Sequence, residues 1–189
     1  MLSQMLDAKE GMRVIDACAG AEGKTLHLAS PMKNKGKIIA LETFQWKLDE
    51  LKKRATRAGV NIIETREISS SKIIKRLADS ADRLLLDVPC SGLGVLKRNP
   101  DIKWNISVSA IEELKKIQQD ILFRYSCRVK AGGKMIYATC SILPSEGEDQ
   151  LKNFISEKKE MWSLVSEKIF SPYKNDCDGC YLAVLDRKT

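Results

Sequence analysis

The stretch MRVIDACAGAEGKT, residues 12–25, sets a short apolar run directly before a turn of small residues. Residues 12–17 are rich in β-forming side chains and end in an acid and small residues, and residues 20–23 follow as a turn. Lys24 then opens a segment with helical character. A strand that leads through a glycine turn into a helix is typical of α/β folds, whose ligands bind at the carboxyl ends of the strands.

Outward from this stretch, short apolar runs alternate with longer segments of helical period. We expect strands at residues 12–17, 37–41, 60–63, 83–88, 134–138 and 181–185, and helices at residues 24–30, 44–58, 71–78, 111–129 and 145–158. This alternation predicts an α/β fold with a parallel sheet. The apolar core of residues 83–88 is too continuous for an edge strand, so we expect it in the centre. Gly132 and Gly133 should end the long helical segment, and Ser145 is a candidate helix N-cap, with Glu148 three residues on.

Length and composition restrict the class of protein. A chain of 189 residues suits one domain over residues 1–189, and 43% hydrophobic with 30% charged residues is globular rather than disordered. No apolar run approaches the ~20 residues that span a bilayer. Residues 1–11 lack the basic start and apolar core of a secretory signal. We therefore expect a soluble cytoplasmic domain that does not bind a membrane.

Charge and cysteine content say less about the binding partners than length and composition say about the class of protein. Lys and Arg number 32 against 25 Asp and Glu, a net charge of +7, which suits a nucleic acid partner and equally suits a mixed soluble surface. The cysteines, which lack an export context, are expected to be free thiols. Cys177 and Cys180 have metal-ligand spacing, but one pair cannot complete a tetrahedral zinc site, so no metal is predicted. Cys127 is expected in the core, and His27 is interpreted as structural.

Two features at strand ends suggest an adenosine-containing cofactor. The small residues at 18–23 allow backbone N–H groups to approach a ligand, and the following helix N-terminus adds positive potential. Glu42, at the end of the second strand, can accept hydrogen bonds from both hydroxyls of a ribose. Neither feature is specific, since a tight turn or a solvated glutamate gives the same pattern. The segment is not a phosphate-binding P-loop, because Cys18 stands where that motif needs glycine.

A pair of cysteines follows two strands in matched positions. Cys90 follows the strand at 83–88, and Cys140 follows the strand at 134–138. If these strands are neighbours, two thiols and Asp87 face one cleft, although either cysteine alone could be a small buried hydrophobe. A thiolate adds readily to an electron-poor carbon such as carbon 6 of a pyrimidine. Carbon 5 can then attack a methyl sulfonium, after which a second group helps to remove the carbon 5 proton and to expel the cysteine.

Three motifs carry a family resemblance: D-A-C-A-x-x-x-G-K-T at 16–25, D-V-P-C-S-G-x-G-V-x-x-R-x-P-D-I-K-W at 87–104, and Y-A-T-C-S-I-L-P-S-E at 137–146. The chain resembles the Sun-type (nucleolar-protein/Sun) RNA cytosine-5 methyltransferases, most closely the bacterial members that act on small-subunit ribosomal RNA. The resemblance implies a class I, Rossmann-like α/β fold with a seven-stranded, mostly parallel sheet, an antiparallel last strand and helices on both faces. It implies S-adenosylmethionine as cofactor and RNA as partner.

The resemblance also implies roles for individual residues. Cys140 would be the nucleophile, Cys90 would assist breakdown of the covalent adduct, Asp87 would touch the cofactor's methyl end and the target base, and Lys24 would close the glycine loop. The implied cofactor-binding residues are Cys18, Ala19, Gly20, Ala21, Glu22, Gly23, Lys24, Glu42, Lys47, Glu67 and Asp87, with Glu64 as the alternative to Glu67. The implied RNA contacts are Lys97, Arg98 and Lys103, next to Trp104. The alternative for this basic loop is a solvated segment with Trp104 packed on the body, and the basic residues of the second helix are expected to be a solvated face.

The chain departs from the family at two places. Its first motif reads C-A-G-A-E-G-K where the family usually has C-A-A-P-G-G-K, so Glu22 replaces a glycine beside the cofactor. The family's N-terminal RNA-recognition region is absent before the first strand, which indicates an excised catalytic domain or a reduced protein. Both departures motivate a second hypothesis, a non-catalytic or weakly active cofactor- or RNA-binding domain. A third, an NAD enzyme, is disfavoured because no G-x-G-x-x-G follows the first strand.

Overall fold

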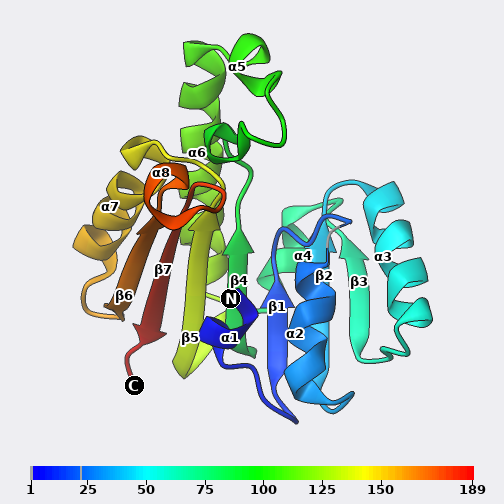
Figure 1. The fold of residues 1–189 in the computed structure, drawn as a ribbon. Helices are drawn as coiled ribbons and strands as arrows, with labels where there is room; N and C mark the ends of the chain where they lie inside the picture. Colours follow the sequence, from blue (N-terminus) through cyan, green and yellow to red (C-terminus); the bar gives the residue numbers. More distant parts are fainter. Residues whose placement is uncertain (1, 22) are drawn as a thin grey trace.

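The computed structural model describes residues 2–21 and 23–189 and contains one seven-stranded sheet (Figure 1). The strand order across the sheet is β3 (Ile63–Glu67), β2 (Lys37–Glu42), β1 (Arg13–Asp16), β4 (Ala81–Asp87), β5 (Val129–Thr139), β7 (Cys180–Arg187) and β6 (Trp162–Phe170). Strands β1 to β5 pair in parallel, whereas β7 is antiparallel to both of its neighbours. The expected α/β fold, with its antiparallel last strand, is confirmed.

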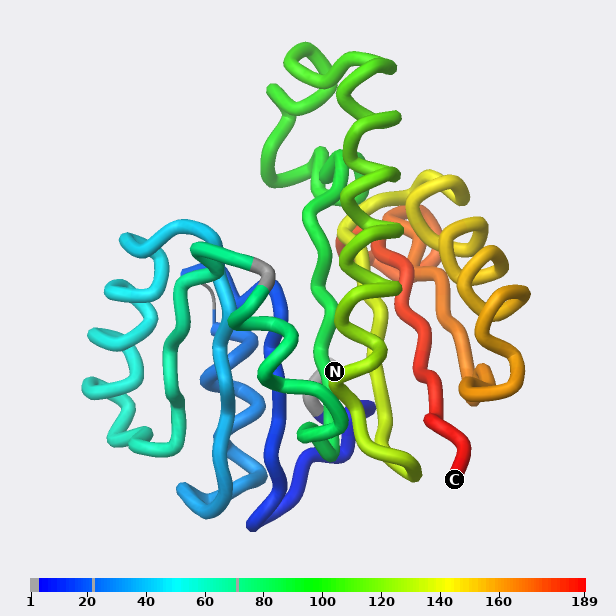
Figure 2. Tube along the Cα trace, turned by 180° about the vertical axis from the view of Figure 1, so that it is seen from behind, coloured from blue at the N-terminus to red at the C-terminus, as the bar shows by residue number. Residues whose placement is uncertain are grey.

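Helices cover both faces of the sheet (Figures 1 and 2). One face carries α1 (Leu2–Leu6), α2 (Lys24–Met32) and α3 (Gln45–Arg57), and the other carries α4 (Ser71–Lys75), α6 (Val108–Ser126) and α7 (Glu148–Lys158). The short elements η1 (Leu93–Val95), α5 (Ile102–Asn105), η2 (Pro144–Glu146) and α8 (Pro172–Asn175) lie in the loops that follow the strands. No helix in the described part of the chain is long and apolar enough to cross a membrane.

The central strands bury side chains on both faces. In β4, Leu84 and Leu86 belong to the core beneath α4, α6 and α7, whereas Leu85 belongs to the core beneath α1 and α2. Successive strand residues point to opposite faces, so a strand covered on both sides must be apolar at every position. This explains the continuous run at 83–88 and confirms the central position predicted for it.

The edge strands are the elements that the sequence pattern misplaced or missed. The third strand was predicted at 60–63 but lies at Ile63–Glu67, where charged residues alternate along β3. Val60 and Ile62 instead pack against the α1–α2 core before the strand begins. Strand β6 was not predicted at all, because its outer positions are exposed and it lacks an apolar run.

Three further local predictions were wrong. Gly132 and Gly133 do not end a helix but lie inside β5, where the register with β4 shifts, and a Cβ on Gly133 would lie 2.4 Å from Val129 Cγ1. Ser145 lies in η2 rather than capping α7, which follows Gly147 without a side-chain cap. Cys127 is exposed rather than in the core, because it follows the last turn of α6 at the surface.

Trp162, at the start of β6, is 2% exposed and packs on Phe154 of α7, whereas Trp104 on α5 is 78% exposed. We expect Trp162→Ala to lower the free energy of unfolding by about 3–5 kcal/mol, through lost burial and the cavity left behind. Trp104→Ala is the matched control and should change it by less than about 0.5 kcal/mol. Urea unfolding of the two variants measures both values, and equal losses would contradict this packing.

Candidate active site

The two cysteine motifs meet at one edge of the sheet. Strands β4 and β5 are parallel neighbours, Asp87 pairs in register with Ala138, and Val88 N donates to Ala138 O at 3.1 Å. Cys90 and Cys140 therefore follow adjacent strand ends, as predicted, and both side chains are half-buried. The Cys90 sulfur also lies close enough to the next loop to make a hydrogen bond with the Cys140 backbone.

An ion pair joins this edge to the start of α2. Lys24 Nζ binds Asp87 Oδ2, with both side chains partly exposed. Asp16, at the end of β1, is buried and accepts a hydrogen bond from Thr25 Oγ1 at 2.7 Å, while its Oδ1 has no hydrogen-bond partner among the described residues. Burial, with the nearby Asp87 charge, raises the pKa of Asp16 to about 7 against the opposing effect of Thr25.

The glycine-rich loop is held between two strands. Ala17 N donates to Leu85 O and Ala19 N to Leu41 O, both at 3.0 Å, and Gly20 adopts a φ of +56°. A Cβ on Gly23, just before α2, would meet no heavy atom of the described residues within 4 Å, its chain neighbours aside, so the backbone there borders space that these residues leave open. Glu22, which the sequence analysis singled out, lies outside the described residues. The loop leaves room for a ligand against the N-terminus of α2.

Glu42 presents a carboxylate at the end of β2. Its Oε1 accepts hydrogen bonds from Thr43 N at 2.7 Å, Thr43 Oγ1 at 2.9 Å and Phe44 N at 3.2 Å, and Lys47 Nζ lies 3.5 Å from Oε2. Burial alone would raise the pKa of Glu42, but these hydrogen bonds and the Lys47 charge outweigh it and hold the pKa below its usual value. Oε2 is thus an ionised acceptor beside the glycine-rich loop, suited to ribose hydroxyls.

The structure separates the two candidates on β3. Glu67 is exposed at the carboxyl end of the strand and pairs in register with Glu42. Glu64 pairs with Ile39 farther down the sheet and forms ion pairs with Lys37 and Arg66. Only Glu67 shares the edge of the sheet that carries the other site residues.

The basic loop after β4 is partly neutralised. Arg98 Nη2 lies 2.7 Å from Asp178 Oδ2, and Lys97 Nζ lies 3.9 Å from Asp176 Oδ1. Lys103 Nζ lies 4.9 Å from the centre of the Trp104 ring, on α5, which projects beyond the sheet (Figure 1). The exposure of Trp104 contradicts the alternative in which it packs on the body. A pocket of about 390 Å³ opens beneath α5, bounded by residues 98–102 on one side and reaching Ser91.

A third thiol, which the sequence analysis left without a role, lies at the same place. The β5–β7 register pairs Thr139 with Tyr181, so Cys140 and Cys180 flank the end of that ladder. Burial, and next the neighbouring Cys140, raise the pKa of Cys180 to about 11. The signal in the sequence was the position of Cys180 directly before the apolar run predicted as the last strand.

Backbone contacts between glycines close the site. Gly94 N donates to Cys140 O at 3.0 Å, and Gly179 N donates to Gly94 O at 2.7 Å. A Cβ on Gly94 would lie 2.0 Å from Gly179 O, so only glycine allows these backbones to approach. The loops that carry Cys90, Cys140 and Cys180 are therefore packed as one unit.

Local environment distinguishes the remaining groups. Burial, and secondarily the nearby Cys140 and Glu146, raise the pKa of Cys90 to about 12, so this thiol is neutral at pH 7. Burial also raises the pKa of Cys18, so this thiol of the glycine-rich loop is neutral at pH 7. His27 is exposed on α2. Within the part of the chain that the structure describes, no group of three or more His, Cys, Asp or Glu side chains could hold a metal ion.

Comparisons with a family model and with known proteins point to the same family. Residues 3–185 match the family model described as "16S rRNA methyltransferase RsmB/F". A probable ribosomal RNA small subunit methyltransferase B of Synechocystis sp. is 36% identical over 84% of this chain and 36% of its own length. Ribosomal RNA small subunit methyltransferase B of Yersinia enterocolitica is 34% identical over 97% of this chain and 44% of its own length. The chain thus spans less than half the length of these relatives.

Solved structures agree. The crystal structure of PH0851 matches 97% of this chain, and 44% of that chain, with a TM-score of 0.93 and 32% identity. The structure of NSun6 from Pyrococcus horikoshii with SFG matches 99% of this chain, and 50% of that chain, with a TM-score of 0.88 and 26% identity.

The buried Asp16 should make stability depend on pH. An unfolded aspartate loses its proton near pH 3.8, whereas folded Asp16 keeps it to about pH 7, so the folded state binds the extra proton between these values. The free energy of unfolding should therefore fall as pH rises across this window, by up to about 1.4 kcal/mol per pH unit. We expect Asp16→Asn, which keeps the Thr25 contact, to flatten this slope.

Urea unfolding at intervals from pH 4.5 to 8 measures the effect. Asp149→Asn, on the exposed side of α7, is the matched control and should retain the wild-type slope. An Asp16→Asn profile parallel to that of the wild type would refute the raised pKa.

Proposed function

The chain belongs to the RsmB/F family of 16S rRNA methyltransferases, and on this basis we propose that it transfers a methyl group from S-adenosylmethionine to carbon 5 of a cytosine in ribosomal RNA. The observation that carries the proposal is the convergence of Cys90, Cys140 and Asp87 at the ends of two adjacent parallel strands. Two thiols in one half-buried site suit a reaction in which one attacks and the other assists release. Since we propose ribosomal RNA as the substrate, we also propose that the reaction takes place in the cytoplasm.

The donor set fits S-adenosylmethionine, the cofactor of this family. The open space beside Gly23 and the N-terminus of α2 suit the methionine end, with residues 18–24 as the cradle. The ionised Glu42 is suited to the ribose, with Lys47 beside it, and Glu67 to the adenine. When bound, the cofactor supplies a methyl group on a positively charged sulfur, and we assign its methyl end to the side of Asp87.

The chemistry then follows from the side chains of this chain. The Cys140 sulfur forms a bond to carbon 6 of the cytosine, which makes carbon 5 nucleophilic enough to take the methyl group. Solvent water takes the carbon 5 proton, the electron pair of the broken C–H bond forms the double bond between carbons 5 and 6, and the Cys140 sulfur leaves carbon 6 as a thiolate, with Cys90 assisting this release. The Lys24 ammonium forms an ion pair with Asp87 and so holds its carboxylate at the edge of the sheet where we place the base. A cytosine must leave its stack to reach this point, near residues 89–94.

We propose that the RNA approaches over α5 and the loop before it. Lys103 and the exposed Trp104 offer a cation and a stacking surface on one projecting helix. Lys97 and Arg98 contribute only as far as phosphates replace Asp176 and Asp178. The basic face of α3 lies away from this loop at the β3 end of the sheet (Figure 1). Its Lys52, Lys53 and Arg54 form ion pairs with acids of the same helix.

Substitution of Cys140 and substitution of Cys90 should impair different steps of the reaction. Cys140→Ala should lower methyl transfer by roughly 10³-fold or more and form no covalent RNA adduct, because the attacking atom is gone. Cys90→Ala should still attack but release slowly, so that RNA remains bound to the protein on a denaturing gel. The assay combines the chain, a 16S rRNA transcript and radiolabelled S-adenosylmethionine.

Cys127→Ala, at an exposed thiol remote from the site, is the matched control and should keep wild-type activity. Full activity in both site variants, or no methyl transfer by a folded wild-type chain that binds S-adenosylmethionine, would overturn the proposal.

The RNA surface predicts a salt effect. Lys103→Ala should weaken RNA binding and reduce the slope of log affinity against log salt by about 1, because one phosphate contact is lost. Lys53→Ala on α3 is the control and should leave the slope unchanged. Fluorescence anisotropy over a salt series measures both slopes, and equal effects of the two substitutions would rule out α5 as the RNA contact.

A further inference from the structure

The buried Glu146 side chain connects the loop that carries Cys90 with the loop that carries Cys140. Glu146 ends η2, six residues after Cys140, and is fully buried. Its Oε1 accepts from Ser91 N at 2.9 Å, and its Oε2 accepts from Ser91 Oγ at 2.5 Å. Ser91 directly follows Cys90, so one side chain from the Cys140 loop accepts from both hydrogen-bond donors of the residue next to the second thiol.

The helix α6 completes this contact. Gln118 Nε2 donates to Glu146 Oε1 at 2.9 Å and to Pro89 O at 3.0 Å. Pro89 and Ser91 flank Cys90, so the Cys90 loop is fixed on both sides of its thiol. The position of Cys90 then depends on a buried network rather than on the loop's own backbone.

The Cys140 side of the network is fixed in the same way. Ser141, directly after Cys140, places its Oγ 3.2 Å from Ser91 Oγ and accepts from Leu143 N at 3.1 Å. Tyr137 OH donates to the Glu146 carbonyl at 2.9 Å. Residues adjacent to both thiols thus belong to one hydrogen-bonded unit with Glu146 at its centre.

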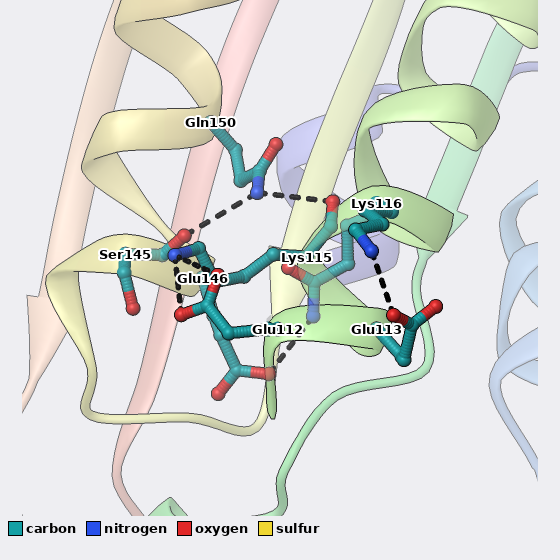
Figure 3. Close-up of polar contacts among 8 residues, drawn as sticks. Glu112, Glu113, Lys115, Lys116, Ser145, Glu146 and Gln150 are labelled. Carbon is teal, nitrogen blue, oxygen red and sulfur yellow. Dashed lines mark hydrogen bonds and ion pairs between the residues drawn. The ribbon is translucent and has the colours of Figure 1, made fainter. Parts of the chain in front are cut away.

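The helices α6 and α7 hold η2 in place around this unit. Figure 3 shows Gln150 of α7 directed between α6 and η2. Its Nε2 donates to Lys115 O on α6 at 3.1 Å and to Ser145 O in η2 at 3.4 Å. Ser145 precedes Glu146, so the backbone that carries the carboxylate is itself anchored to α6.

Fold stability alone does not account for a carboxylate at this position. Burying the group costs its hydration, and its three side-chain contacts are with neutral donors. An apolar residue of similar size often stabilises a fold as well as a buried charge does. The contacts instead link groups that flank the two reactive thiols, which is a geometric role.

We propose that Glu146 is a positioning residue that fixes Cys90 relative to Cys140, so that the step that needs both thiols, release of the methylated RNA, depends on it. The inference rests on the proposed two-thiol mechanism and assigns that mechanism a structural control. Addition of Cys140 is affected less, because the Glu146 side chain bonds Ser91 and Gln118 directly and reaches Ser141, next to Cys140, only through Ser91. Binding of S-adenosylmethionine depends on other residues.

The test compares Glu146→Ala with Glu146→Gln. Glu146→Ala should lower kcat by about 10- to 100-fold, leave KM for S-adenosylmethionine within about threefold of wild type, and accumulate covalent RNA adduct on a denaturing gel. Glu146→Gln should recover at least about a third of kcat, because its amide oxygen can accept from Ser91 N and Gln118 and its amide N–H can donate to Ser91 Oγ. Glu148→Ala, two residues later, is the matched control and should behave as wild type.

Ser91→Ala keeps the test decisive if Glu146→Ala does not fold, since it removes one hydrogen bond and should still cause several-fold adduct accumulation. Release at the wild-type rate in a folded Glu146→Ala or in Ser91→Ala would overturn the inference, as would a loss of activity in Glu146→Ala that Glu146→Gln does not restore. If Cys140→Ala and Cys90→Ala fail as expected while Glu146→Ala releases normally, only this inference falls. If the cysteine variants remain active, the proposed function falls with it.

Discussion

The parallel pairing of β4 with β5 determines where the residues of the candidate active site lie. Hydrogen bonds along this ladder bring both carboxyl ends to the same edge, so the residues that follow each strand, including Cys90 and Cys140, emerge side by side. Parallel strands need a crossover, and α6 provides it across one face. Because that same helix carries Gln118, the connection that the topology requires also supports the loops it joins.

Antiparallel β7 extends this arrangement in a way that parallel strands could not. It enters the sheet from the edge where the parallel strands end, so Cys180 and the loop before it lie against the Cys140 loop. The contacts of Gly94 with Cys140 and Gly179 depend on this direction, because they join a segment that leaves β4 to a segment that enters β7. The loops that carry Cys90, Cys140 and Cys180 are thereby held at a fixed spacing, which depends on contacts between the ends of several strands.

The sequence predicted the centre of the fold far better than its edges, for a physical reason. Strands β2, β4 and β5 are covered on both faces, so their apolar runs were visible as strands, and the cysteines could be assigned to their ends. Strands β3 and β6 are half exposed, and their charged positions conceal the period. Ser91, Gln118 and Glu146 were equally invisible, because buried polar residues show their role only once the donors that surround them are known.

The three thiols at the site show how environment divides one residue type into different roles. Cys90 is half-buried beside Glu146 and Cys140 and holds its proton at pH 7, which makes it unsuited to attack and suited to a step that passes a proton. Cys180 is also held neutral, at the far side of Cys140. Burial is the main reason that each of these two thiols keeps its proton, and electrostatic interaction with Cys140 in both cases, and with Glu146 at Cys90, adds to it. The Glu146 side chain, which we propose fixes the spacing of the loops, thus also favours the neutral form of Cys90, the thiol to which we assign the assisting role.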